Sequence, residues 1–422
     1  MLYQVYEFQR SILNPLTAFA QAQAHWLNHP MNPFLIHPLN RRVAAGYELL
    51  YRLGKEYEKP QFGLEYTRVD GVEYAVAEEV VARKPFCRVL RFKKLDAEHL
   101  TQPKVLIFAP LSGHFATLLR DTVRAMLPDF DVYITDWADA KMVPLSAGRF
   151  HLNDYVAYCI EFMQRLGPDL HVMSVCQPTV PVMAAVSIMS TLKDPKRPIS
   201  MTMMGGPIDP RESPTQVNNL ATTKPFDWFE LNVIATVPEK YPGAGRRVYP
   251  GFMQHAGFVA MNPDRHFNSH WDYYQDLIKG DLDDVEAHRK FYDEYNAVLD
   301  LDADYYLATI KTVFQDHALP KGTWDVMLGG KPQRVRPQDI TDIALLTVEG
   351  ELDDISGPGQ TQAAHGLCTG IPASMQKDFV AEGAGHYGIF SGRRWREIIY
   401  PVVREFMHKH EAKARSRKRQ PA

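Results

Sequence analysis

Cys176 stands where a buried strand is predicted to turn directly into a helix. The residues before it, 170–175, are mostly apolar, and Pro178 falls in the first turn of the predicted helix, where a missing N–H costs nothing. The positive end of that helix and the free backbone N–H groups of its first turn would both favour a thiolate. Cys176 is therefore a candidate nucleophile. A buried structural cysteine is the alternative, because free cysteines are among the most buried residues.

Carboxylates and a histidine follow this cysteine in the chain, each just beyond a predicted strand. The run 341–350 is apolar enough for a buried strand, and Asp353 and Asp354 come shortly after it. A second strand is predicted over 377–381, and His386 lies in the glycine-rich loop behind it. His386 would take the proton of the thiol, and Asp353 would fix the imidazole tautomer. Asp354 stays open as an alternative acid, because the two carboxylates are adjacent.

Two backbone N–H groups could stabilise the oxyanion that forms when a thiolate attacks a carbonyl group. One belongs to Gln177, directly after the nucleophile, and the other to Leu111 or Ser112, in the turn after a strand predicted from residue 104 to 109. Ser112 is set aside as a nucleophile, because it follows a different strand and its loop lacks the strand-turn-helix pattern.

The elements that must position these residues alternate between strands and helices. Strands are predicted over 105–109, 132–136, 170–175 and 199–204, with helices near 115–126 and 155–166 between them. Such alternation predicts a mostly parallel sheet covered by helices on both faces. A nucleophile, an acid and a base that follow successive strands in this order are typical of the α/β-hydrolase fold, which we therefore expect.

Four parts are predicted along the chain. Residues 1–60 form a helical segment that packs on or beside the core, and 61–209 together with 338–412 form the α/β-hydrolase core. The alternation stops over 210–337, which is rich in aromatic residues and is predicted to be an inserted helical cap. The last segment, 413–422, is basic and is predicted to be disordered.

Composition restricts the class of protein further. A chain of 422 residues with a net charge of −3 has no excess of positive charge for nucleic acid. The four cysteines are scattered without metal or disulfide spacing, and no signal peptide or membrane span is expected, so a cytoplasmic location is predicted. His266 and His270 are four residues apart but lack an acidic partner, so neither a metal nor a bound cofactor is expected.

Several motifs together resemble one family of bacterial enzymes, the intracellular poly(3-hydroxybutyrate) depolymerases. They are SVCQP at 174–178, GGPID at 205–209, GELDDI at 350–355, GHYG at 385–388 and the opening MLYQVYE. The resemblance covers nearly the whole chain, and its specific part is the Cys-Gln-Pro turn, because most esterases use serine.

This resemblance implies both a mechanism and a partner. Cys176, Asp353 and His386 would serve as nucleophile, acid and base in cleaving the polyester through a thioester acyl-enzyme. The acyl group would pass to water, or to a thiol such as coenzyme A, and yield 3-hydroxybutyrate units. The implied partners are the surface of the polymer granule and its coat proteins. The oligomeric state is left open.

Two other functions remain to be weighed. A polyester synthase uses the same three residue types, but it carries glycines on both sides of the cysteine and a histidine directly after the acid. This chain has Ser174, Pro178 and Asp354 at those positions, which favours cleavage. A granule-binding protein without activity is the second alternative. The apolar stripe Phe8, Ile12, Leu13, Leu16, Phe19 and Ala20 is predicted to dock on the core, with contact to the granule as the alternative.

Overall fold

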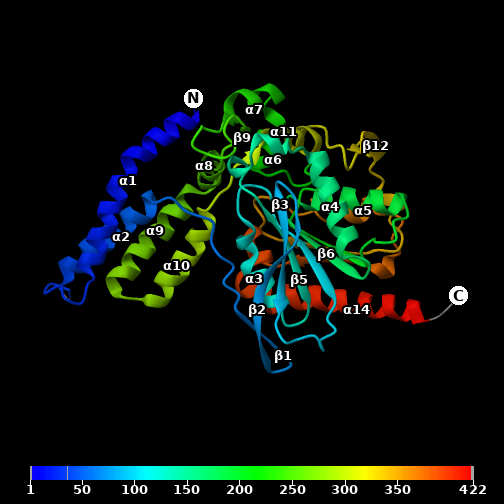
Figure 1. Cartoon of the computed structure of the whole chain (residues 1–422), viewed down its shortest axis with the longest axis horizontal. Helices are drawn as coiled ribbons and strands as arrows, with labels where there is room; N and C mark the ends of the chain where they lie inside the picture. The colour runs from blue at the N-terminus through cyan, green and yellow to red at the C-terminus, as the bar shows by residue number, and fades with distance from the viewer. Residues whose placement is uncertain (1, 36, 420–422) are drawn as a thin grey trace.

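The computed structural model describes residues 2–35 and 37–419, and its centre is one nine-stranded sheet (Figure 1). The strand order is β1-β2-β3-β5-β4-β6-β7-β13-β14. The strands are β1 (Tyr66–Val69), β2 (Val72–Arg83), β3 (Cys87–Lys94), β4 (Lys104–Phe108), β5 (Asp131–Trp137), β6 (Leu170–Val175), β7 (Ser200–Met204), β13 (Ala344–Gly350) and β14 (Gln376–Ala381). From β5 to β14 neighbouring strands pair in parallel, whereas β1 to β3 pair antiparallel. The predicted mostly parallel sheet is confirmed.

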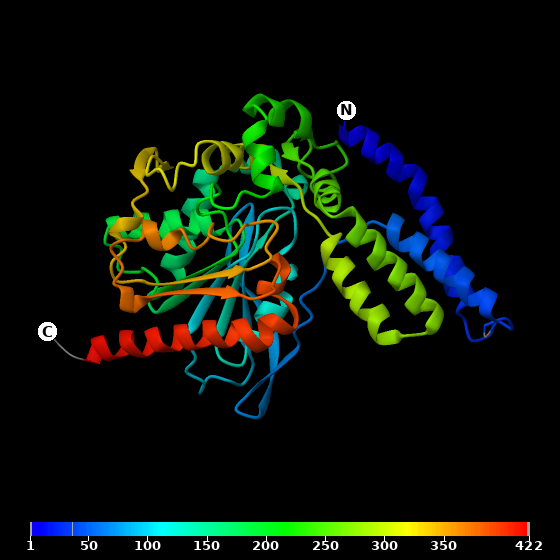
Figure 2. The same cartoon turned by 180° about the vertical axis from the view of Figure 1, so that it is seen from behind.

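Helices cover both faces of this sheet, because parallel strands must be joined by crossovers that pass over a face. On one face lie α4 (Leu152–Leu166) and α5 (Thr179–Thr191), which pack together. On the other lie α3 (Arg120–Met126) and α14 (Tyr400–Arg419), and Figure 2 shows α14 running alongside the sheet. Short helical elements complete the core: η1 (Ala116–Leu119), η2 (Ala140–Met142), η3 (Leu145–Ala147), α12 (Ala364–Leu367), η6 (Ala373–Met375), η7 (His386–Ile389), α13 (Gly392–Arg394) and η8 (Trp395–Ile399).

The strands beneath the site are buried along their whole length. Every residue of β6 and of β13 is buried. Strands that are covered on both faces have continuous apolar sequences, and this pattern is why they can be predicted from the sequence. Helix α5 is also buried on every side, from Thr179 to Ser190, so its first turn is held firmly against the end of β6.

A cap is inserted between β7 and β13 and lies over the carboxyl ends of the parallel strands (Figure 1). Its helices are α6 (Gln216–Thr223), α7 (Phe226–Val233), α8 (Gly251–Met261), α9 (Pro263–Lys279), α10 (Leu282–Tyr295) and α11 (Ala303–Thr309), followed by the helical turns η4 (Ile310–Gln315) and η5 (Pro337–Asp339).

The cap is mostly helical, but it also contains short strands that the sequence does not predict. Its strands are β8 (Ala235–Thr236), β9 (Arg247–Tyr249) and β10 (Leu301–Asp302), which form a small antiparallel sheet, and the hairpin of β11 (Asp325–Leu328) and β12 (Lys331–Arg334). Each is two to four residues long, too short to show an alternating pattern in the sequence.

The N-terminal segment forms two helices, α1 (Leu2–Leu27) and α2 (Pro38–Gly54), that pack against each other. Helix α2 lies between α1 and helices α9 and α10 of the cap in both views (Figures 1 and 2). The segment therefore packs beside the cap, whereas the sequence analysis places it on or beside the α/β core.

The predicted docking stripe of α1 faces outward, so that prediction is wrong. Phe8 is 67 % exposed and Leu16 is 55 % exposed, while Ala20 is buried. Small residues face α2 instead, because alanines let two helix backbones approach closely; the buried ones are Ala20, Ala24, Ala44 and Ala45.

The C-terminal helix is longer than expected. Helix α14 continues to Arg419, so the backbone of 413–419 is helical and not disordered as predicted. Residues 420–422 of the predicted tail lie outside the described residues.

Candidate active site

Cys176 lies at a strained turn between β6 and α5. Its φ is +69°, in the left-handed region that residues with a Cβ rarely adopt. The turn is held by the Cys176 N–H, which donates to Met204 O at 2.7 Å, and by the Thr179 N–H, which donates to Cys176 O at 3.1 Å. This turn places the half-buried thiol at the carboxyl end of the sheet, where it lines the cavity.

Gly205 and Gly206, at the end of β7, let the neighbouring strand approach this turn. A Cβ on Gly206 would lie 1.9 Å from Thr179 Oγ1 and 2.4 Å from Cys176 O. Gly205 has a φ of +52°, and a Cβ there would lie 3.3 Å from an Asp353 carboxylate oxygen. In the sequence these glycines stand out only as part of the motif GGPID, and no pattern there places them at the site.

The His386 ring is oriented by Asp353. Nδ1 of His386 lies 2.7 Å from Oδ2 of Asp353, and both side chains are buried. The other carboxylate oxygen accepts hydrogen bonds from the backbone N–H groups of Ile355 at 2.9 Å and Ser356 at 2.8 Å. The carboxylate is thus fixed from both sides, and the histidine presents its other nitrogen to the cavity.

The charge state of His386 follows from its neighbours. Burial by itself lowers the pKa of the imidazole, but the Asp353 carboxylate and the Cys176 sulfur outweigh it and hold this pKa well above its usual value. These two neighbours therefore favour the protonated, imidazolium form of the ring. Such a cation favours negative charge on the sulfur, which is what a thiol nucleophile requires.

Asp354, the alternative acid, points elsewhere. It is exposed, and its Oδ2 accepts a hydrogen bond of 2.9 Å from the side chain of Asn262 in the cap. The structure brings Cys176, Asp353 and His386 together and leaves Asp354 outside the group.

The candidate oxyanion donors lie beside the cysteine. Gln177, Leu111 and Ser112 all line the same cavity as Cys176. No hydrogen bond between residues that the structure describes uses the backbone N–H of any of these three. Tyr305 of the aromatic-rich cap, which no motif in the sequence singles out, donates its hydroxyl to Leu111 O at 2.9 Å. A cap residue therefore holds the loop that would supply the second donor.

The cavity above the cysteine has a volume of about 560 Å³ and mostly apolar walls. The core contributes its floor, including Cys176, Gln177 and His386. The cap contributes the aromatic walls, which include Phe229, Tyr249, Phe258, Tyr305, Tyr306 and Phe314. In the sequence, only the high aromatic content of 210–337 indicates such walls. Which of these residues line the cavity depends on contacts between segments that are far apart in the chain.

The two cap histidines that are four residues apart, His266 and His270, both contact tyrosines. His266 lies within 3.0 Å of the Tyr292 hydroxyl and 3.2 Å of the Tyr295 hydroxyl, and the His270 ring packs against Tyr292. Within residues 2–35 and 37–419, no group of three or more His, Cys, Asp or Glu side chains is placed to hold a metal ion. In that same range, no helix has both the length and the hydropathy that crossing a membrane requires.

Comparison of sequences gives a match to a protein family. Residues 205–411 match the family model described as "PHB de-polymerase C-terminus". The matched region contains Asp353, His386 and the whole cap, while Cys176 lies before it. The comparison with curated protein sequences gives no match.

Solved structures with a similar fold are distant in sequence. A 2-hydroxy-6-oxo-6-phenylhexa-2,4-dienoate hydrolase from Rhodococcus sp. strain RHA1 is 12 % identical, with a TM-score of 0.44, over 79 % of this chain and 99 % of its own. A monoacylglycerol lipase from Paleococcus ferrophilus is 12 % identical, with a TM-score of 0.41, over 74 % of this chain and 97 % of its own. The assignment of the α/β-hydrolase fold rests on the strand order and on the strand ends that carry the site.

Proposed function

Because the chain belongs to the PHB depolymerase family, we propose that it is an ester hydrolase that degrades stored poly(3-hydroxybutyrate) with Cys176 as nucleophile. The observation that carries the proposal is the strained turn that aims Cys176 at the buried His386–Asp353 pair, under one apolar cavity. A structural cysteine would need neither a strained backbone nor a charged histidine beside it.

The first half of the reaction makes a thioester. The Cys176 sulfur attacks the ester carbonyl carbon, and the electron pair of the carbonyl moves to its oxygen. The N–H groups of Gln177 and of Leu111 or Ser112 would stabilise this oxyanion. When the intermediate collapses, the C–O bond to the rest of the polymer breaks, and the His386 imidazolium protonates the departing alcohol.

The second half releases the acyl group. Neutral His386 takes a proton from water, the hydroxide attacks the thioester carbonyl, and the C–S bond breaks to regenerate the thiolate and the imidazolium. Coenzyme A could replace water in this step, because a thiol is also deprotonated by the histidine; the product would then be a coenzyme A thioester.

The cavity supports a polyester substrate. Its volume lies within the range of about 300–1,000 Å³ that is typical of small-molecule sites, so it would take a short stretch of a polymer chain. Aromatic and aliphatic walls match a chain that carries a methyl group on every repeat. All four cysteines are free, which suits a reducing cytoplasm where storage granules and their coat proteins would be the partners.

The test is release of 3-hydroxybutyrate from amorphous poly(3-hydroxybutyrate) particles. Wild type is compared with Cys176→Ala, and the acyl-enzyme is trapped and located by mass spectrometry. We expect release that disappears in the variant and an acyl group on Cys176. Release that survives the substitution would exclude this nucleophile. A parallel incubation with 3-hydroxybutyryl-CoA tests the synthase alternative, since polymer growth without release would show synthesis.

Adding coenzyme A to the release assay distinguishes the two acceptors. Free acid as the product in the presence of coenzyme A indicates hydrolysis, whereas 3-hydroxybutyryl-CoA indicates thiolysis.

A further inference from the structure

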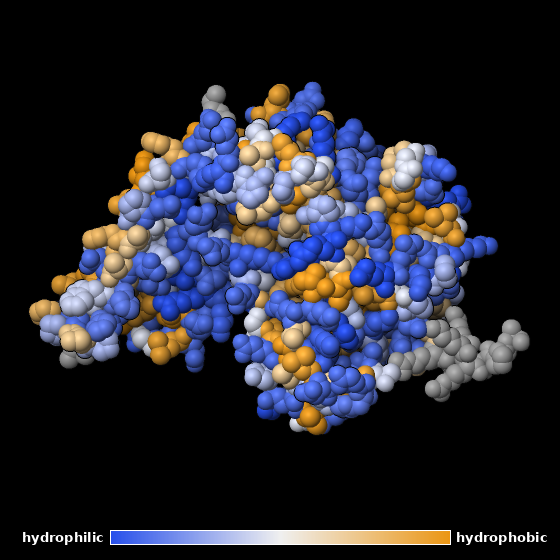
Figure 3. Space-filling model, viewed as in Figure 1, coloured by the Kyte–Doolittle hydropathy of each residue, from blue (hydrophilic) through white to orange (hydrophobic). Residues whose placement is uncertain are grey.

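The outward face of α1 carries a continuous row of large apolar side chains. We call Val5, Phe8, Ile12, Leu16 and Phe19 the outer stripe; they are three or four residues apart, so they follow one face of the helix. Each is more than half exposed. Figure 3 shows apolar side chains along the outer edge of α1, at the left of the view. Monomeric proteins rarely expose so long a row without a partner for it.

The row continues beyond the helix. Trp26 at the end of α1 and Met31 and Phe34 in the connection to α2 are also exposed, and Met31 reaches 80 %. A helix of 26 residues is about 39 Å long, so the apolar face is extended and not a compact spot. Its shape matches a broad surface better than a pocket on a partner.

Formal charge is missing from this part of the chain. From residue 11 to residue 40 there is no Asp, Glu, Lys or Arg, although charged residues make up 23 % of the whole sequence. The polar residues in that stretch are Asn, Gln, Ser, Thr and His. From residue 11 onward the surface is therefore apolar with neutral hydrogen-bonding groups around it, and the two charged residues near its start, Glu7 and Arg10, bind Lys240 and the Gly54 carbonyl oxygen.

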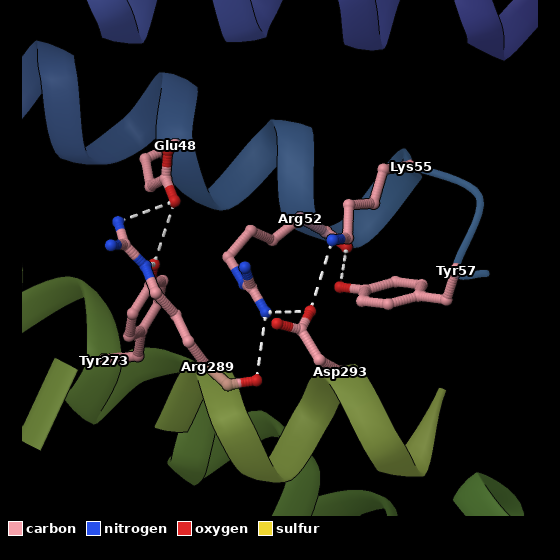
Figure 4. Close-up of polar contacts among 7 residues, drawn as sticks. All are labelled: Glu48, Arg52, Lys55, Tyr57, Tyr273, Arg289 and Asp293. Atoms are coloured by element: carbon pink, nitrogen blue, oxygen red, sulfur yellow. Dashed lines mark hydrogen bonds and ion pairs between the residues drawn. The ribbon is translucent and has the colours of Figure 1, made fainter. Parts of the chain in front are cut away.

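The inner side of the helix pair is fastened to the cap by charged groups (Figure 4). Arg52 of α2 pairs with Asp293 of α10 at 2.7 Å. Glu48 of α2 accepts hydrogen bonds from Arg289 at 2.9 Å and from the Tyr273 hydroxyl at 3.1 Å. Charge thus lies on the side that faces the protein, and the uncharged stripe lies on the side that faces away.

The start of α1 is anchored as well. The Tyr3 hydroxyl donates to Asp300 Oδ2 at 2.6 Å in a buried contact, and the Tyr6 ring stacks on Phe252 at 4.1 Å between centroids. Both partners belong to the cap. The stripe is therefore held on a platform fixed to the cap that covers the active site.

We propose that the outer stripe is the surface by which this protein adsorbs to amorphous polyester. The proposal rests on the proposed function, because it takes the substrate named there as the partner. A polyester carries methyl groups and ester oxygens but no charge and no hydrogen-bond donor. The stripe offers apolar area to the methyl groups, and the neutral amides and hydroxyls around it can donate to the ester oxygens.

Other partners fit this surface less well. Anionic lipid headgroups and nucleic acids are attracted by lysine and arginine, which residues 11–40 lack. A second copy of the chain would bury the apolar row, but helix pairs in proteins usually set their register with charges beside the apolar seam. Residues 11–40 lack those charges too, so we assign the face to a neutral polymer.

The test compares two triple variants in the Cys176→Ala background, so that adsorption is measured without cleavage. The stripe variant carries Phe8→Gln, Ile12→Gln and Leu16→Gln. The control carries Val72→Gln, Leu192→Gln and Ile398→Gln, which replace apolar residues of similar exposure (51–62 %, against 53–67 % in the stripe) on other parts of the surface. Both are co-sedimented with amorphous poly(3-hydroxybutyrate) particles, and their folding is compared by thermal unfolding.

We expect the stripe variant to lose about tenfold or more in affinity for the particles, because binding strength follows the apolar area buried, and the control to keep its affinity. With Cys176 restored, hydrolysis of a soluble short-chain ester should stay within about twofold of wild type, since the substitutions are far from the cavity. Equal adsorption of the two triple variants would overturn the proposal.

The remaining outcomes separate the two proposals and the other partners. Adsorption through the stripe without any 3-hydroxybutyrate release from wild type would support the surface and contradict the proposed function. Wild type that forms a dimer by light scattering, and a stripe variant that is a monomer yet still adsorbs, would assign the face to a second copy. Stripe-dependent binding to phosphatidylglycerol vesicles in preference to the polymer would assign it to lipid.

Discussion

Two adjacent carboxylates, Asp353 and Asp354, have different surroundings. Asp353 is buried and bonded to the His386 ring and to two backbone N–H groups. Asp354 is exposed and bonded to Asn262. Neighbouring residues of this loop point in different directions. Asp353 can therefore orient the histidine, whereas Asp354 cannot.

We expect Asp353→Asn to lower kcat/KM for a soluble ester by about 10³- to 10⁴-fold, because the amide would stabilise neither the tautomer nor the imidazolium. Asp354→Asn is the matched control and should stay within about twofold. Steady-state kinetics of the two purified variants test this. Equal losses of kcat/KM in the two variants would mean that activity depends on the conformation of the loop and not on the Asp353 carboxylate.

The raised pKa of His386 makes a prediction about pH. The imidazolium persists above its usual titration range, and the acid for the departing alcohol is lost where the ring gives up its proton. Asp353→Asn removes the largest influence that raises this pKa, so the alkaline limb of kcat/KM should move to lower pH. Asp354→Asn should leave the limb in place. A limb at the same pH in all three proteins would contradict the assignment of His386.

At the scale of elements, the site depends on how closely β7 and α5 approach the turn at Cys176. Gly206→Ala would place a Cβ 1.9 Å from Thr179 Oγ1 and 2.4 Å from Cys176 O, and a backbone oxygen cannot move away cheaply. We expect a loss of about 1–3 kcal/mol in the free energy of unfolding, together with a loss of activity.

Gly46→Ala in α2 is the control for this substitution. No atom lies within 4 Å of its added Cβ, so it should stabilise by about 0.5–1 kcal/mol through the helix preference of alanine. Chemical denaturation of both variants measures the difference. A Gly206→Ala variant with an unchanged free energy of unfolding would show that the turn can move to accommodate the added Cβ.

At the scale of the whole molecule, acid should weaken the cap. Burial, together with neighbouring histidines and arginines, lowers the pKa of His270 to about 4 and that of His288 to about 3. The unfolded chain binds these protons below about pH 6.5, whereas the folded chain does not until pH 4 or 3. The free energy of unfolding therefore falls as the pH drops from 6.5 towards 4.

We expect His288→Phe, which keeps a ring stacked on Tyr273, to reduce the loss of melting temperature between pH 7 and pH 5. His99→Gln replaces an exposed histidine and should change nothing. Scanning calorimetry of the three proteins tests the expectation. The same loss in wild type and in His288→Phe would mean that another group governs the acid transition.

The whole molecule also divides its tasks between parts. The sheet holds Cys176, Asp353 and His386 at its strand ends, and the cap closes the cavity and fixes the loop at Leu111 through Tyr305. The helix pair of α1 and α2 is attached to the cap on the side away from the sheet (Figure 2). Binding to a surface and cleavage of a bond would thus be carried by different parts of one chain.

The sequence alone was enough for the fold class and for the identity of Cys176, Asp353 and His386 as candidates. Buried strands have continuous apolar sequences, so they can be recognised. Parallel strands bring their carboxyl ends to one edge of the sheet. Residues that directly follow such strands can therefore be predicted to lie close together. The choice between Asp353 and Asp354 needed the structure, because a loop's direction depends on contacts with residues far away in the chain. The same holds for Gly206 and Tyr305, whose partners are distant in sequence.

The outward face of α1 was also decided only by tertiary structure. A helical apolar stripe shows which residues share a face, but not whether that face meets the protein or the solvent. Here the alanines pack against α2, and the side chains of the outer stripe remain more than half exposed. Periodicity is a local property of the chain, whereas the partner of a face is chosen by the packing of the whole molecule.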